Sequence, residues 1–259
     1  MLYNLHTHTR RCHHAEGEDR AYVEAAITAG IKVLGFSDHS PQFFGKPGYY
    51  SHFRMRPDVC EDYVVSVRAL QREYKQDIDI LLGFETEYYP ESFDRLRAFL
   101  APFDIDYLIM GQHFVGNEYD EEAYLDNGHY GERYLKQYTE QVAEGLRTGA
   151  FTYIAHPDIA YFNGSRRVYE REMTKLCALA KQLDIPLEFN MLGYQRGRSY
   201  PNPDFWRIAA KTGNKTIIGF DAHTPGALCD LDTYRACRGK LAKLGVTPAD
   251  WNTFAIAKP

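Results

Sequence analysis

The chain has 259 residues, 44% of them hydrophobic and 25% charged, which is ordinary globular composition and enough to bury the core of one α/β barrel. Its net charge of -5 argues against a nucleic acid as the main partner. The five cysteines are irregularly spaced without a C-x-x-C pair, and neither a secretory signal nor an apolar membrane-spanning run is found, so we expect a cytoplasmic protein with free thiols.

Two histidines stand close to the N-terminus, in Leu5-His6-Thr7-His8-Thr9, and Cys12-His13-His14 follows them. Residues two apart in an extended strand point to the same side, so His6 and His8 would place two imidazoles in one small volume. Imidazole is the commonest metal ligand among side chains and binds zinc, iron and manganese. An isolated H-x-H also fits surface or tag-like histidines, so its meaning depends on the rest of the chain.

Helix and strand patterns alternate from there on, without a linker or a low-complexity tract, and predict one domain spanning residues 1–259. Apolar residues recurring on one face, together with Gly and Pro stops, predict helices at 19–29, 58–74, 91–100, 131–148, 170–183 and 204–212. Short apolar runs predict buried strands at 33–37, 78–82, 107–110, 151–155, 186–189 and 215–220, and one more helix and a tail complete the chain. This alternation implies a parallel sheet with right-handed crossovers, either a closed barrel or an open doubly wound sheet.

Two features favour the barrel. No glycine-rich phosphate loop follows the first strand, as a dinucleotide-binding open sheet requires. Metal-binding residue types follow nearly every strand, at the end where parallel barrels build active sites. These residues are His6, His8, Asp38, His39, Glu85, His113, His156, Asp221 and His223. One such residue alone is more often structural, but their recurrence indicates a polynuclear metal site, and mixed His and carboxylate ligands are typical of a catalytic cluster.

The ordered motifs resemble those of the PHP (polymerase and histidinol phosphatase) superfamily, most closely its monofunctional histidinol-phosphate phosphatases, over essentially the whole chain. They are His6-Thr7-His8, Ser37-Asp38-His39, Gly83-Phe84-Glu85, Gly111-Gln112-His113, Ala155-His156-Pro157-Asp158 and Gly219-Phe220-Asp221-Ala222-His223. The resemblance implies a distorted (β/α)7 TIM-like barrel with three divalent metal ions (Zn, Fe or Mn) at the C-terminal face of its parallel strands.

The resemblance also implies a distribution of ligands among the three ions. The implied sets are His6, His8, Glu85 and Asp221 at one ion, Glu85, His113 and His156 at the second, and His14, His39 and His223 at the third. The family commonly has Cys-Pro-His where this chain has Cys12-His13-His14, so His14 is the better match and His13 the spare. Cys12 as a ligand is the less favoured alternative.

Charge points to the chemistry. Three dications with only Glu85 and Asp221 as anionic ligands leave a positive excess, which suits a hydroxide and a dianionic phosphate monoester. We therefore expect a hydrolase, specifically a phosphoric monoester hydrolase, in which a metal-bound hydroxide attacks phosphorus in line. The resemblance alone suggests L-histidinol phosphate as the substrate, cleaved to L-histidinol and phosphate in histidine biosynthesis. The predicted catalytic residues are Glu85, Asp221, His223 and Asp38. Asp38 and Asp158 would orient imidazoles or protonate the leaving alkoxide.

Arg196 and Arg198 follow the sixth strand, and a guanidinium matches phosphate geometry. The family places phosphate-contacting arginines in this region, so we predict that they bind the substrate; a solvated basic loop is the alternative. The expected partner is a small phosphate monoester, with neither a membrane nor a nucleic acid. Alternative functions are hydrolysis of another phosphate ester or of a nucleotide or nucleic-acid phosphodiester, and a catalytically silent metal-binding module. The native metal and the oligomeric state stay open.

Overall fold

The computed structural model describes residues 1–46, 48–49, 51–119, 124–127 and 131–259. Its strands are β1 (Tyr3–Asn4), β2 (Val33–His39), β3 (Asp79–Thr86), β4 (Tyr107–Met110), β5 (Leu187–Asn190) and β6 (Thr216–Gly219). Its α-helices are α1 (Asp19–Thr28), α2 (Cys60–Glu73), α3 (Phe93–Leu100), α4 (Glu132–Arg147), α5 (Arg166–Gln182), α6 (Met191–Gln195), α7 (Pro203–Thr212) and α8 (Leu231–Ala242). None of the helices in these described ranges is long and apolar enough to cross a membrane.

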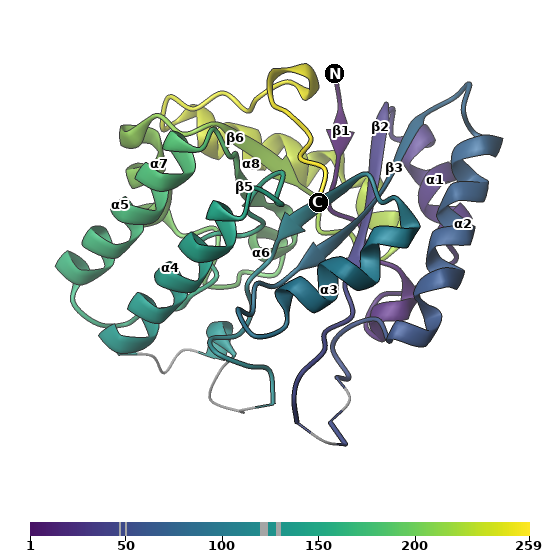
Figure 1. Cartoon of the computed structure of the whole chain (residues 1–259). Coiled ribbons are helices and arrows are strands. Elements are labelled where there is room, and N and C mark those ends of the chain that lie inside the picture. The colour runs from purple at the N-terminus through teal and green to yellow at the C-terminus, as the bar shows by residue number, and fades with distance from the viewer. Residues whose placement is uncertain (47, 50, 120–123, 128–130) are drawn as a thin grey trace.

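Hydrogen bonds join the strands into a parallel ring. Strands β1 to β4 pair in chain order, and β5 pairs with β6. Ile154 bridges β4 to β5, and a parallel bridge between Thr7 and Ala222 joins the segment after β6 to the segment after β1. Helices α1 and α2 run along one side of the strands and α4, α5 and α7 along the other, as the distorted barrel requires (Figure 1).

The predicted strand at 151–155 is reduced to this bridge. Ile154 pairs with Met110 and Leu187, but His156 takes a positive φ of 31° and so leaves the extended conformation at once. The ladder is therefore too short to count as a strand, although it still occupies the position between β4 and β5 in the ring. The predicted strand therefore lies at the predicted place in the chain, but it is much shorter than predicted.

Other boundaries also differ from the sequence-based predictions. Strand β2 continues to His39 because Ser37, Asp38 and His39 pair in register with residues 83–85 of β3. Glu85 therefore lies within β3 and does not follow it. Helix α5 begins four residues earlier than predicted, at Arg166. Helix α6 occupies part of the expected arginine loop, with the Asn190 side chain as its cap.

The interior of the ring is filled by apolar side chains. They are Tyr3, Leu5, Val33, Tyr107, Ile109, Tyr153, Ala155 and Ile217. The Tyr107 ring takes the space above Gly35 and Gly83, where an added Cβ would lie 2.2 Å and 2.4 Å from its atoms. Its hydroxyl donates to the backbone oxygens of Leu5 and Phe36, at 2.8 Å and 3.1 Å. This core closes the barrel beneath the carboxyl ends of the strands, where the polar residues gather.

Candidate metal centre

Residues from both ends of the chain meet at the carboxyl ends of the strands. His6 and His8 follow β1, and Asp221 follows β6. The Nε2 atoms of His6 and His8 lie 3.5 Å and 3.2 Å from Asp221 Oδ1. They lie 3.5 Å and 3.4 Å from Glu85 Oε2. All four side chains are buried, so the predicted convergence of this H-x-H pair with two carboxylates is observed.

Glu85 stands between this group and three further imidazoles. Its Oε2 atom lies 3.1 Å from His39 Nδ1. Its Oε1 atom lies 2.8 Å from His156 Nε2 and 3.7 Å from His113 Nε2. The two oxygens of one carboxylate thus face two sets of imidazoles, which is the arrangement of a bridging ligand.

His14 and His223 lie at the outer side of the cluster. The His223 ring stacks on the rings of His8 and His14, with centroids 4.2 Å and 4.9 Å apart. His14 lines the cavity above the cluster, whereas His13 is exposed, with φ 71°, and ends a short turn. The thiol of Cys12 is buried and donates to the Thr9 carbonyl oxygen at 3.2 Å.

The donor atoms fit divalent cations. His6 Nε2, His8 Nε2 and Glu85 Oε2 are buried and have no hydrogen-bond partner in the part of the chain that the structure describes. Buried polar atoms are seldom left in this state, so a missing partner is indicated. The sets of ligand atoms that lie within 4.8 Å of one another include His6, His8 and Asp221; His6, Glu85 and His156; and His8, His39 and His223. Two further sets contain the Cys12 thiol, one with His14 and His223 and one with His8 and Asp38. Mixed imidazole and carboxylate sets of this kind suit zinc, iron or manganese.

The electrostatics of the cluster favour anionic carboxylates. Burial would raise the pKa values of Glu85 and Asp221, but the surrounding imidazoles outweigh it and hold both well below their ordinary range. Burial likewise opposes protonation of His6 and His8, but neighbouring carboxylates raise both pKa values well above the ordinary one. A bound cation would replace these imidazole protons, because ligands must be deprotonated.

His39 and His223 behave in the opposite way. Burial is the largest cause and lowers the pKa of His39 well below its usual value and that of His223 to about 3. The neighbouring imidazole of His8 acts in the same direction on both. Both rings are therefore neutral at physiological pH, which is the form that ligates a metal.

The backbone holds two candidate ligands in an unusual conformation. His156 and Asp221 have φ values of 31° and 52°, which non-glycine residues rarely adopt and which is common at functional sites. Gly111 makes room for a third candidate ligand, Glu85. A Cβ at Gly111 would lie 1.8 Å from Glu85 Oε1, so only glycine leaves this carboxylate its place.

Two buried glutamates support the cluster from behind. Glu188 Oε2 lies 2.8 Å from His6 Nδ1, and Glu87 Oε1 lies 2.9 Å from His113 Nδ1. Neither Glu188 nor Glu87 was predicted from the sequence to belong to the site. A signal for Glu188 was present, because a charged residue inside the apolar strand run 186–189 must find a partner when it is buried.

Asp38 lies near the predicted ligands without facing the cavity. Its Oδ1 atom is 3.6 Å from His8 Nδ1 and accepts the backbone N–H of His39 at 2.8 Å. Its other oxygen accepts a short hydrogen bond from the Thr9 hydroxyl. Asp38 therefore lies at the back of the cluster, and its role in orienting an imidazole stays a prediction.

Asp158 contacts the start of α7. Its carboxylate accepts hydrogen bonds from the Asn202 backbone N–H, at 2.5 Å, and from Trp206 Nε1, at 3.1 Å. It thereby ties the strand-end turn to the start of α7, and none of its hydrogen bonds among the described residues goes to an imidazole. Burial raises its pKa to about 7.

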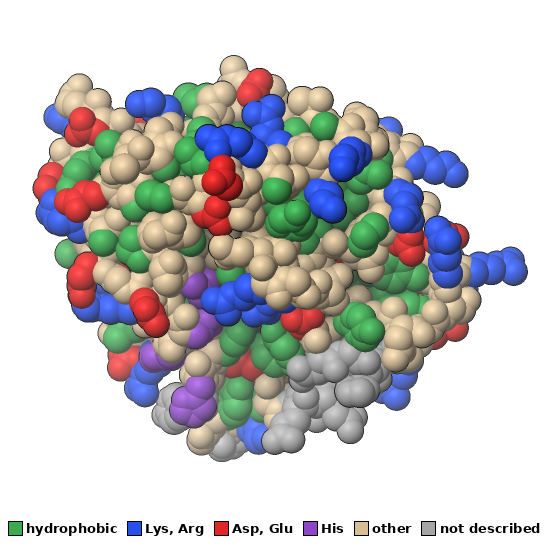
Figure 2. Space-filling model, turned by 180° about the vertical axis from the view of Figure 1, so that it is seen from behind, with side chains coloured by type: hydrophobic (Ala, Val, Ile, Leu, Met, Phe, Trp, Pro, Cys, Tyr) green, Lys and Arg blue, Asp and Glu red, His purple; other side chains and the backbone are tan. Residues whose placement is uncertain are grey.

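A cavity of about 240 Å³ opens above the cluster. It is lined by His14, His39, Phe53, Glu85, His113, Tyr124, Leu192, Arg196, Arg198, Tyr200, Asp221 and His223. Arg196 is exposed, and Arg198 Nη1 lies 3.3 Å from Asp126 Oδ2 and 3.2 Å from the Tyr200 hydroxyl. Histidine side chains reach the surface at the lower left of the face in Figure 2, next to basic side chains.

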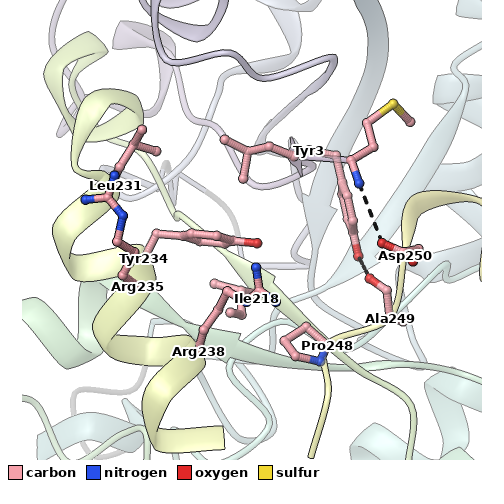
Figure 3. A pocket seen from close by; sticks show the side chains of 11 residues that line it. Tyr3, Ile218, Leu231, Tyr234, Arg235, Arg238, Pro248, Ala249 and Asp250 are labelled. Carbon is pink, nitrogen blue, oxygen red and sulfur yellow. Dashed lines mark hydrogen bonds and ion pairs between the residues drawn. The ribbon is translucent and has the colours of Figure 1, made fainter. Parts of the chain in front are cut away.

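A second cavity, of about 320 Å³, lies at the other end of the strands. Tyr3 at the start of β1 and Tyr234 of α8 face it, and Tyr3 donates to the Ala249 backbone oxygen at 2.8 Å (Figure 3). None of the predicted site residues lines it. The chemistry-bearing residues therefore belong to the cavity at the carboxyl ends.

Comparisons with known proteins found a matching family, similar sequences and similar solved structures. The PHP domain family matches residues 4–192. The chain is 33% identical to a Deinococcus radiodurans protein named a probable histidinol-phosphatase, over 87% of each chain, and 25% identical to the histidinol-phosphatase of Bacillus subtilis, over 85% of this chain and 93% of that one. Among solved structures, it resembles histidinol phosphate phosphatase from Lactococcus lactis, complexed with zinc, L-histidinol and phosphate, with a TM-score of 0.75, 18% identity and coverage of 99% and 97%.

Proposed function

The chain belongs to the PHP family and is a phosphatase of that family, and we propose that its substrate is L-histidinol phosphate, cleaved to L-histidinol and inorganic phosphate. Support for this substrate comes from the histidinol-phosphatases among its relatives and from the ligands of the Lactococcus protein. We further propose that residues 1–259 act as one domain, because the ring of strands returns to its first member.

The central support for metal-dependent hydrolysis is the placement of Glu85. Its two oxygens face His6, His8 and His39 on one side and His113 and His156 on the other. Among the described residues, no hydrogen-bond donor reaches its Oε2 atom. A buried carboxylate shared by this many imidazoles makes sense as a bridge between cations.

We assign three divalent ions to this centre. His6, His8, Glu85 and Asp221 would hold one, Glu85, His113 and His156 the second, and His14, His39 and His223 the third. When bound, such ions would supply an activated water and offset the charge of the phosphate. Cys12 is a weaker candidate because its thiol already donates to a backbone oxygen.

The chain's own residues would bind and orient the ester. Arg196 and Arg198 line the cavity and can donate to phosphate oxygens as a planar fork. His223 also lines the cavity and can face the reacting atoms, whereas Asp38 does not line it and acts through His8. Glu85 and Asp221 at the cavity floor would fix the position of the reacting phosphate through the centre.

A phosphate-release assay on metal-reconstituted protein tests the proposal. The substrates are L-histidinol phosphate, a panel of small phosphomonoesters and a phosphodiester such as bis(p-nitrophenyl) phosphate. We expect the highest kcat/KM for L-histidinol phosphate, with loss of turnover on chelation and recovery on adding metal. Preference for another monoester would replace L-histidinol phosphate as the assigned substrate. Preference for the diester would favour a phosphodiesterase. Turnover of none of these substrates would contradict the proposal that the protein is a phosphatase.

A further inference from the structure

Glu188 is a fully buried carboxylate whose oxygens are both engaged. Its Oε2 atom lies 2.8 Å from His6 Nδ1. Its Oε1 atom accepts from Asn190 Nδ2 at 2.7 Å and from the His156 backbone N–H at 3.4 Å. Because protein donors occupy both oxygens, we do not expect Glu188 itself to bind a metal ion. A carboxylate can only accept, so the hydrogen of the His6 ring must sit on Nδ1, and Nε2 is left to face Asp221.

Glu87 repeats this arrangement on another strand. It directly follows β3, and its Oε1 atom lies 2.9 Å from His113 Nδ1 and 3.2 Å from Arg54 Nη2. Its other oxygen accepts a short hydrogen bond from the Tyr89 hydroxyl. The Nε2 atom of His113 is again the one that faces Glu85. In both His6 and His113, therefore, a buried glutamate accepts the hydrogen of Nδ1 and leaves Nε2 facing the cluster.

The two glutamates differ in how their charge is offset. Glu87 pairs with the buried guanidinium of Arg54, which also pairs with Glu118. Within the described part of the chain, Glu188 forms an ion pair with His6 and with no lysine or arginine. A buried charge without such compensation is costly, so cations bound at the centre would offset the charge of Glu188 more than that of Glu87.

The neighbouring strand leaves room for Glu188. A Cβ at Gly219 of β6 would lie 2.0 Å from Glu188 Oε2 and 2.3 Å from its Cδ. Gly219 pairs with Asn190 in the ladder between β5 and β6, so the contact is set by the sheet. The carboxylate can therefore be displaced without changing its own chemistry, by adding one methyl group to the strand beside it.

We propose that Glu188 and Glu87 are positioning residues for the metal centre. Each accepts the Nδ1 hydrogen of one histidine, His6 or His113, and so presents the Nε2 atom of that ring as the ligand. The metal-binding part of this inference rests on the proposed function, but the assignment of the two tautomers does not. Partners of this kind set the ring orientation and raise the basicity of the ligating nitrogen.

The tautomers can be measured directly in the wild-type protein. In ¹⁵N-histidine spectra of the metal-free and zinc-loaded protein, with rings assigned by single His→Gln variants, His6 and His113 should carry the hydrogen on Nδ1. A hydrogen on Nε2 of either ring in the zinc-loaded protein would overturn the assignment for that residue. This measurement needs no glutamate variant to fold and no substrate to turn over.

Metal affinity then tests the consequence. By competition with a chelator, we expect Glu188→Gln and Glu87→Gln each to weaken the binding of one ion by about 10–100-fold, with the larger loss for Glu188→Gln. Gly219→Ala should reproduce the Glu188→Gln loss, because it displaces the same carboxylate. Metal-free thermal melts report whether each variant is folded.

Two matched controls separate positioning from general loss of a buried charge. Glu118 shares Arg54 with Glu87 but does not contact His113, and Glu172 is a buried, ion-paired carboxylate of α5. Glu118→Gln and Glu172→Gln should keep wild-type metal affinity. If Glu87→Gln only matches Glu118→Gln, or Glu188→Gln only matches Glu172→Gln, the positioning role is refuted. Absence of metal binding in the wild type would contradict the proposed function instead. The Nδ1 hydrogens of His6 and His113 that face the two glutamates would still be tested by the ¹⁵N spectra of the metal-free protein.

Discussion

Gly111→Ala should disable the centre by steric displacement alone. The added Cβ would lie 1.8 Å from Glu85 Oε1, 2.4 Å from its Cδ and 2.6 Å from its Cγ. Ordinary contact begins near 3.4 Å, so the carboxylate oxygen would have to move by roughly 1.6 Å. A metal site tolerates about 0.2 Å in its ligand distances, so this displacement breaks the proposed bridge.

The expected loss is large, since a misplacement of about 1 Å can cost about 10²-fold in rate. Phosphate release by Gly111→Ala should fall by at least that factor, and elemental analysis should show fewer bound ions than in the wild type. The matched control is Gly239→Ala in α8, where an added Cβ meets nothing within 4 Å. Gly239→Ala should keep full activity and metal content.

Thermal melts of the metal-free proteins make the comparison specific. If Gly111→Ala folds, binds wild-type amounts of metal and turns over substrate normally, then Glu85 does not hold the centre together and the bridging role is refuted. Loss of activity with unchanged metal content would place the effect of Glu85 on the substrate and not on the ions.

The remaining predictions concern charge. Arg196→Ala and Arg198→Ala should each leave metal content and folding intact while lowering kcat/KM for every phosphomonoester by roughly 10²–10³, with partial rescue by Lys; near wild-type values in both would make the segment a solvated basic surface. Glu85→Gln should lose more metal than Glu87→Gln, because only Glu85 lies between the sets of imidazoles, and equal metal content in the two would contradict this. A last prediction concerns the carboxylate of Glu172. Burial would raise its pKa, but ion pairs with Lys175 and Arg171 hold this pKa below its ordinary value. Its stabilising effect is thus present above its unfolded pKa of about 4.3 and lost as pH falls through the lower folded value, so Glu172→Gln should lower the Tm of chelated protein at pH 7 and much less near pH 3.

The strand-end ligands were predictable because of a simple geometric rule. The carboxyl ends of parallel strands meet at one end of a barrel, so His39 and His156 had to come near each other whatever the loops between them did. In the structure both imidazoles reach Glu85. The alternation of helical and strand periods predicted the parallel sheet, and the strand-end residues with the missing glycine-rich loop favoured the barrel. The match with the PHP family confirms that part of the prediction.

The parts that the sequence did not predict depend on contacts between distant segments. Glu188 looked like an ordinary strand residue, and only the fold brings it to His6, 182 residues away. Asp158 stands two residues after a candidate ligand, yet its carboxylate turns toward the start of α7 and away from the cluster. Local periodicity does not predict which partner the Glu188 or Asp158 side chain contacts, because that partner comes from a distant segment brought close by tertiary packing.

The claim that these strand ends form one metal centre can be tested by anomalous diffraction from crystals of the zinc-reconstituted protein. We expect three anomalous peaks within the buried cluster, ligated by His6, His8, His14, His39, Glu85, His113, His156, Asp221 and His223. A pair of those peaks should share Glu85. Crystals of fully reconstituted protein with no peak in the cluster, or with a single one, would contradict this claim.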